Sequence, residues 1–170
     1  MIVDSSPSVY KTPPMSGSIK TLTYIFAALP VVLVYTGITI HNGFLLLAVF
    51  FILLIAGVWL WMRPTHYEVT GRTLTIVWPL RRHVVLRSSI HRIRILDKTE
   101  IKKELGFAMR IGVGGLFGGF GLLWTRRRGL VRFYITRLDF FIMIDRRNDR
   151  PLLITVDNPQ RMLKELETGG

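Results

Sequence analysis

Residues 21–40 read TLTYIFAALPVVLVYTGITI and residues 44–62 read FLLLAVFFILLIAGVWLWM, with only His-Asn-Gly between them. Neither segment contains Asp, Glu, Lys or Arg. A helix of about 20 residues, rising about 1.5 Å per residue, matches a hydrocarbon core of about 30 Å. So short a connection returns the second helix antiparallel to the first. The sequence therefore predicts a transmembrane helical hairpin.

Basic residues predict the orientation of this hairpin. The connecting turn has no Lys or Arg, whereas Lys20 precedes the first segment and Arg63 follows the second. Because cytoplasmic loops are rich in basic residues, we expect a multi-pass protein of the plasma (inner) membrane with both termini cytoplasmic. A cleaved signal peptide is the alternative for residues 21–40, but no A-x-A-like site follows them. The absence of charged residues within the segments favours an anchor over a transporter.

The rest of the chain divides into a short tail and one domain. Residues 1–20 contain several prolines and serines with little apolar patterning, which predicts a disordered cytoplasmic tail. Residues 63–170 carry 21 of the 23 Lys and Arg and a formal charge of +11, so this cytoplasmic domain should attract anions. Candidate partners are acidic lipids, acidic proteins and nucleic acid. Cysteine is absent, which excludes disulfides and thiolate metal sites.

Short periodic segments in the domain predict β-strands. Residues 74–78 and 84–86 alternate in the manner of a hairpin around a turn at 79–82. Further strands are expected at residues 92–95, 130–136, 140–145 and 152–156. Acids and lysines interleave between Asp97 and Glu104, which we interpret as a solvated charged turn. After Asp157-Asn158-Pro159, the spacing of the apolar residues predicts a C-terminal helix.

A glycine-rich segment, residues 107–129, reads FAMRIGVGGLFGGFGLLWTRRRG. A G-x-G-x-x-G match fails at Phe117, and no Lys-Ser or Lys-Thr follows, so nucleotide binding is disfavoured. One interpretation is a folded glycine-aromatic hairpin that covers one end of the domain. The other is membrane contact, because uncharged residues including Trp124 precede Arg126, Arg127 and Arg128. Both interpretations can hold together.

The same segment carries a family resemblance. Its most specific part is GVGGLFGGFGLLW, residues 112–124, followed by Gly129 and Tyr134-Ile135-Thr136. The other matching positions are Tyr67-Glu68-Val69, Gly71, Leu74-Thr75-Ile76, Ile90, Val156-Asp157-Asn158-Pro159, Met162 and Leu166. Over about residues 63–167 the chain thus resembles the bacterial pleckstrin-homology-like membrane proteins. The resemblance implies a bent antiparallel, all-β barrel with a C-terminal helix, often behind transmembrane helices, without known catalytic residues.

Two functions follow as hypotheses. The first is a non-enzymatic, membrane-anchored PH-like module without a cofactor. It would bind an anionic membrane surface or lipid through Arg81, Arg82, Trp124, Arg126, Arg127 and Arg128. The alternative is a scaffold or accessory subunit of a membrane complex, in which a sheet edge with Arg92 and Arg94 binds an acidic protein segment. In either case the partner could also be a second copy of the chain.

Other function classes are disfavoured by the residues present. Ser88-Ser89 lacks a G-x-S-x-G setting, and no acid-base pair suggests a lipid-modifying enzyme. The histidines lack H-E-x-x-H or comparable ligand spacing, so no metal site is expected. Nucleic-acid binding is disfavoured because the strands lack the RNP-type aromatic pattern.

Overall fold

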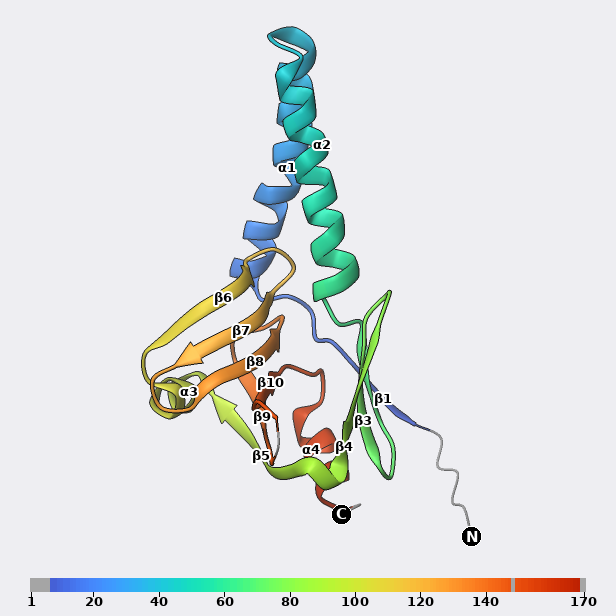
Figure 1. Ribbon diagram of the computed structural model, residues 1–170, viewed down its shortest axis with the longest axis vertical. Coiled ribbons are helices and arrows are strands. Elements are labelled where there is room, and N and C mark those ends of the chain that lie inside the picture. The colour runs from blue at the N-terminus through green and yellow to red at the C-terminus, as the bar shows by residue number, and fades with distance from the viewer. Residues whose placement is uncertain (1–6, 148, 169–170) are drawn as a thin grey trace.

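The computed structural model describes residues 7–147 and 149–168, and it places a helical stalk on a β-rich domain (Figure 1). The stalk consists of α1 (Gly17–Thr39) and α2 (Gly43–Gly57), and α2 continues as a π-helical turn (Val58–Met62). The two antiparallel helices confirm the predicted hairpin, although α1 begins at Gly17 and not at Thr21. Helix α1 and the continuous helical segment Gly43–Met62 are both long and apolar enough to cross a membrane. Only 22% of the most apolar stretch of α1 and 11% of that of α2 is buried, unlike the core helix of a soluble protein.

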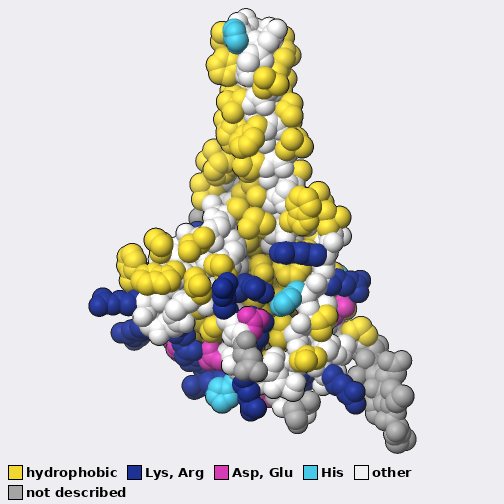
Figure 2. Space-filling view, viewed as in Figure 1, with side chains coloured by type: hydrophobic (Ala, Val, Ile, Leu, Met, Phe, Trp, Pro, Cys, Tyr) yellow, Lys and Arg dark blue, Asp and Glu magenta, His cyan; other side chains and the backbone are white. Residues whose placement is uncertain are grey.

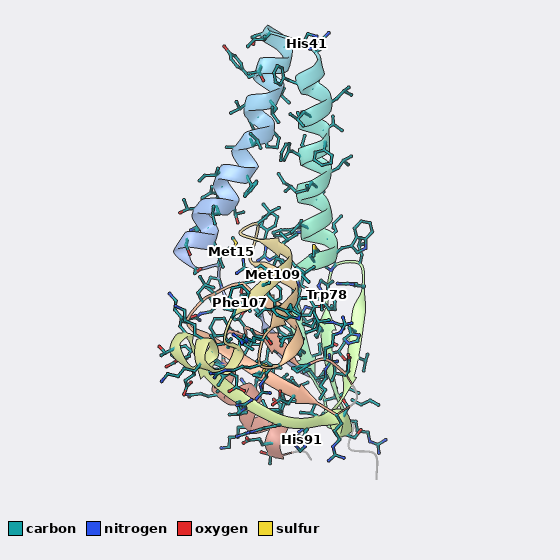
Figure 3. All side chains as sticks on the ribbon, turned by 60° about the vertical axis from the view of Figure 1, so that its left-hand side comes forward. Met15, His41, Trp78, His91, Phe107 and Met109 are labelled. Carbon is teal, nitrogen blue, oxygen red and sulfur yellow. The ribbon has the colours of Figure 1, made fainter. Side chains whose placement is uncertain are left out.

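The helices approach closely near their turn and diverge towards the domain (Figures 1 and 3). A Cβ atom on Gly37 would lie 2.6 Å from Cδ2 of Leu45, so a larger residue here would require the Leu45 side chain to move. Below the point of divergence, the space between the helices receives the tip of a β-hairpin from the domain.

The strands form two sheets. The first has the order β1-β2-β3-β4, with β1 (Ser8–Lys11), β2 (His66–Val69), β3 (Thr73–Val77) and β4 (Arg82–Leu86). A 3-10 turn (Arg87–Ser89) leads to the second sheet, whose order is β5-β9-β10-β8-β7-β6. Its strands are β5 (Ile90–Asp97), β6 (Ala108–Gly114), β7 (Gly119–Thr125), β8 (Gly129–Ile135), β9 (Phe140–Arg146) and β10 (Leu152–Ile154).

The expected antiparallel barrel differs from this arrangement in two ways. The strands are divided between two sheets, and β10 pairs in parallel with β8. Strand β9 pairs with β5 and β10 and not with β8. Strand β10 therefore lies between β9 and β8, and it runs in the same direction as β8. The predicted strands at 74–78, 84–86, 92–95, 130–136, 140–145 and 152–156 are otherwise confirmed as β3, β4, β5, β8, β9 and β10.

Successive side chains on the strands of the second sheet point alternately into two apolar cores. On β9, Ile142 and Ile144 face the core that lies between the sheets, whereas Phe141 and Met143 face a second core under α3 (Lys98–Leu105). Both faces of the strand are therefore buried, as expected for a central strand covered on both sides. The C-terminal helix α4 (Pro159–Thr168) packs Met162 into the first core.

Helix α3 corrects the interpretation of residues 97–104 as a charged turn. The Asp97 side chain accepts hydrogen bonds from the backbone N–H groups of Thr99 and Glu100, and the Glu100 side chain accepts one from the Asp97 N–H. This reciprocal capping box satisfies donors that would otherwise lack partners. Ile101 and Leu105, one helical turn apart, pack on the second core. In α4, the predicted cap is supplied by Asn158, which accepts from the Arg161 N–H.

The prediction of a disordered tail is wrong for Ser8–Lys11, and residues 1–6 lie outside the described part of the chain. Strand β1 pairs antiparallel with β2, and Tyr10 is only 3% exposed. Further along, the Thr136 hydroxyl donates to the Pro13 carbonyl at 3.0 Å. The tail is ordered because β2 offers a free edge and a pocket for one aromatic ring, neither of which is encoded near residue 10.

Candidate functional site

The glycine-rich segment forms the β6–β7 hairpin, whose tip lies between α1 and α2 (Figure 1). The Thr23 hydroxyl of α1 donates to the Gly115 carbonyl at 3.1 Å and accepts from the Phe117 N–H at 2.9 Å. On the other side, the Phe117 ring packs edge-on against Trp59, with 4.8 Å between centroids. These contacts to both helices hold the hairpin at the junction of stalk and domain.

The outer face of this hairpin exposes large apolar side chains. Phe107 is 69% exposed, Met109 53%, Ile111 50% and Trp124 42%. Met109 and Trp124 are cross-strand partners, so their side chains share one face of the sheet. Figure 3 places Phe107 and Met109 in the part of the domain next to the helices, with His91 at the opposite end. We name these four residues the apolar hairpin face.

The arginines that follow β7 have different surroundings. Arg126 is exposed at the end of the hairpin, and Arg127 is exposed while its guanidinium donates to the Lys103 carbonyl. Arg128 instead turns to carboxylates, donating to Asp145 at 2.7 Å and pairing with Glu104. The structure thus leaves Arg126 and Arg127 beside the apolar hairpin face, but it engages Arg128 within the domain.

Arg94 of β5 belongs to the same ion-pair network. Its guanidinium donates to both Glu104 oxygens, at 3.0 and 2.8 Å, and lies 3.2 Å from Asp145. These hydrogen bonds hold the pKa of Glu104 below its usual value. The expected cationic face of β5 is therefore reduced to Arg92, which is exposed, because Arg94 is neutralised by carboxylates of this chain.

Replacing Glu104 with Gln is expected to destabilise the domain by about 2 kcal/mol, because two arginines lose a charged acceptor. The lowered pKa means that the carboxylate stabilises the folded state above the ordinary Glu value of 4.5 and loses this effect as the pH falls through the lower folded-state value. Thermal unfolding in detergent at pH 7 and pH 3 measures both effects. An equal difference between wild type and variant at the two pH values would contradict this role.

Arg81 and Arg82, at the turn between β3 and β4, line a pocket of about 320 Å³ between the two sheets. Trp78 anchors this turn below α2, since its indole N–H donates to the Met62 carbonyl at 3.1 Å (Figure 3). Sequence reasoning missed the remaining basic residues of the pocket, His83, Arg132 and Arg150, because they come from different strands and turns. We name these five residues the basic pocket.

The family described as "Bacterial PH domain" matches residues 65–169, which include nine of the ten strands and α4. The chain belongs to the bacterial PH domain family. This confirms the resemblance seen in the glycine-rich segment. No curated protein and no solved structure matches the chain significantly.

The bacterial PH domain of this chain is completed from outside the matched region. Strand β1 and both helices of the stalk precede residue 65, yet β1 pairs with β2 and α1 binds the hairpin tip. Among residues 7–147 and 149–168, no group of three or more His, Asp or Glu side chains could hold a metal ion. The site is therefore a surface and a pocket built from arginines and apolar side chains.

Proposed function

We propose that this chain is a non-enzymatic, membrane-anchored bacterial PH domain that binds the anionic cytoplasmic surface of the plasma (inner) membrane. In this proposal α1 and α2 cross the bilayer as a hairpin, and both chain ends are cytoplasmic. The observation that carries the proposal is the apolar hairpin face on the side of the domain next to the helices.

The distribution of side chains supports contact with a bilayer. Apolar side chains cover the stalk and continue onto the adjoining part of the domain, where Lys and Arg begin (Figure 2). Aromatic rings such as Trp124 favour the headgroup boundary. Arg126 and Arg127 follow at once, and each cation near an anionic surface contributes about 1 kcal/mol. Apolar insertion and electrostatic attraction therefore act on the same hairpin.

The contacts at the tip of the β6–β7 hairpin support a fixed orientation of the domain relative to the helices. Thr23 binds the tip from α1 and Trp59 contacts it from α2, so the hairpin follows the helices as one body. A rigid link lowers the entropy cost of bringing the apolar hairpin face to the bilayer, because the surface is already close and oriented.

A nitroxide label tests the contact, since the chain has no cysteine and one can be introduced at a chosen position. Labelled Met109→Cys in nanodiscs containing phosphatidylserine is expected to be more accessible to oxygen than to a water-soluble nickel complex. Labelled His91→Cys, exposed at the far end of the domain, is the matched control and should show the reverse. Equal exposure of the two labels to the nickel complex would refute docking.

The orientation has a separate test in intact cells. Asn42→Cys, in the exposed turn between the helices, is expected to react with a membrane-impermeant maleimide added outside. His91→Cys should react only after the cells are lysed. Labelling of His91→Cys in intact cells, or loss of the protein into the aqueous fraction, would overturn the membrane hairpin.

Binding of an acidic protein segment remains the alternative. The strands β5 and β6 form the two edges of the second sheet and could pair with a further strand. The expected attraction between Arg94 and an acidic segment is weaker, because Arg94 already binds Glu104 and Asp145. The geometry therefore favours lipid over this protein partner.

A further inference from the structure

We propose that the basic pocket binds a phosphate group, as a site separate from the apolar hairpin face. The proposal rests on the proposed function only for the position of the pocket near the membrane. The ligand chemistry is a phosphate ester or free phosphate, because guanidinium groups present N–H donors in a fork that matches its oxygens.

The first support is a cluster of arginines that, in the described part of the chain, are without carboxylate partners of their own. Four arginines and a histidine line the pocket, and no carboxylate lines it. Outside the pocket, Arg94, Arg128 and Arg137 each lie in an ion pair with Asp or Glu, and so does Arg146 beside it. Within the described residues, the side chains of Arg81, Arg82, Arg132 and Arg150 form no such pair. These four guanidinium groups outnumber the nearby carboxylate of Asp149, which pairs with Arg146, so their mutual repulsion favours an anion among them.

The second support is a buried polar atom without a hydrogen-bond partner. Nε2 of His83 is buried and has no hydrogen-bond partner among the described residues. Burial and the nearby guanidinium groups of Arg132 and Arg146 hold the pKa of His83 below its usual value, while Asp149 opposes them. A buried polar atom without a partner is costly, and an anion with acceptor oxygens would satisfy this nitrogen.

The third support is that the pocket walls are fixed. The guanidinium of Arg81 stacks on Trp78, 4.3 Å from the ring centroid, and Trp78 packs edge-on against Tyr134 of β8. Across the pocket, the Arg146 side chain donates to the Arg150 carbonyl at 2.9 Å and pairs with Asp149 at 2.6 Å. These contacts hold the Arg81 side chain and the Arg150 backbone in place before any ligand arrives, which favours binding.

The test uses the full chain, labelled with ¹⁵N histidine, in dodecyl maltoside micelles that contain no phosphate. Adding inorganic phosphate is expected to shift the ring signal of His83, assigned with His83→Gln, until it saturates. Chloride at equal ionic strength should not reproduce this shift. Arg81→Gln combined with Arg132→Gln should weaken binding at least tenfold, whereas the control pair Arg92→Gln with Lys164→Gln, both exposed outside the pocket, should not.

Several results would overturn the site: no shift of His83, the same shift with chloride, or unchanged binding in the Arg81 and Arg132 variant. Unaltered signals of His66 and His91 show that each variant is folded. Phosphatidylcholine nanodiscs carrying phosphatidic acid, compared with phosphatidylserine, identify the source. A His83 shift with phosphatidic acid assigns a lipid headgroup, and a shift only with added phosphate assigns a free anion. The nitroxide label at Met109 measures membrane docking, and the His83 signal measures phosphate binding. The failure of one proposal is therefore distinguishable from the failure of the other.

Discussion

Gly121→Val is expected to unfold the β6–β7 hairpin and to lower the stability of the domain by at least about 3 kcal/mol. Gly121 has φ 131°, and a Cβ atom there would lie 2.5 Å from the Ile111 carbonyl oxygen. Its cross-strand partner Gly112 is equally restricted, since its Cβ would lie 2.3 Å from the Phe120 carbonyl oxygen. Both clashes involve backbone atoms, so no side-chain rearrangement can relieve them.

Thermal unfolding followed by near-ultraviolet circular dichroism in detergent measures this effect. Gly71→Val is the matched control, because a Cβ atom on Gly71 meets nothing within 4 Å and its φ lies outside the strained region. The hairpin also carries the apolar face, so Gly121→Val should abolish the lipid contact of the Met109 label. Similar melting temperatures for the two valine variants would contradict the close strand approach.

Tyr10→Ala is expected to destabilise the domain by about 4 kcal/mol, the usual cost of removing a buried aromatic ring. Tyr10 is 3% exposed and its hydroxyl donates to Glu165 of α4, so it links the first strand to the last helix. Burial and this hydrogen bond raise the pKa of Tyr10 to about 12, so the donor stays protonated at neutral pH.

Tyr10→Phe separates the two contributions, because it keeps the ring and removes only the hydrogen bond, at about 1.5 kcal/mol. Guanidinium-induced unfolding of both variants in micelles gives the comparison. A stable Tyr10→Ala protein would show that β1 is dispensable. Loss of stability in Tyr10→Ala would also mean that a fragment starting at residue 63 is destabilised, because it lacks β1 and leaves the β2 edge unpaired.

Sequence patterns predicted the elements whose signals are local. The two uncharged segments gave the helical hairpin, and alternation gave β3, β4, β5, β8, β9 and β10. The signal failed for α3, where two apolar residues stand among charges, although Asp97 and Glu100 have the spacing of a capping box. It failed for β1 because a four-residue strand depends on the edge that it joins.

The candidate site shows the same division. Arg81, Arg94 and Arg128 look alike in the sequence as members of basic clusters, and the sequence predicts a surface role for each of them. Tertiary contacts distinguish them, since Glu104 and Asp145 neutralise Arg94 and Arg128, whereas Arg81 faces a pocket without a carboxylate. Side-chain charge is a property of the residue, but its pairing depends on which strands become neighbours.

By itself, the sequence determined the two apolar helices and the basic β domain that follows, because hydrophobic length, period-two alternation and net charge are properties of contiguous residues. The family was indicated by a resemblance in the glycine-rich segment, which is also contiguous. Only the tertiary structure decided that the tail adds a strand and that the hairpin tip sits between the helices. It also decided that Arg132 and Arg150 join Arg81 around His83. These features bring together residues far apart in the chain, and chain folding alone makes them neighbours.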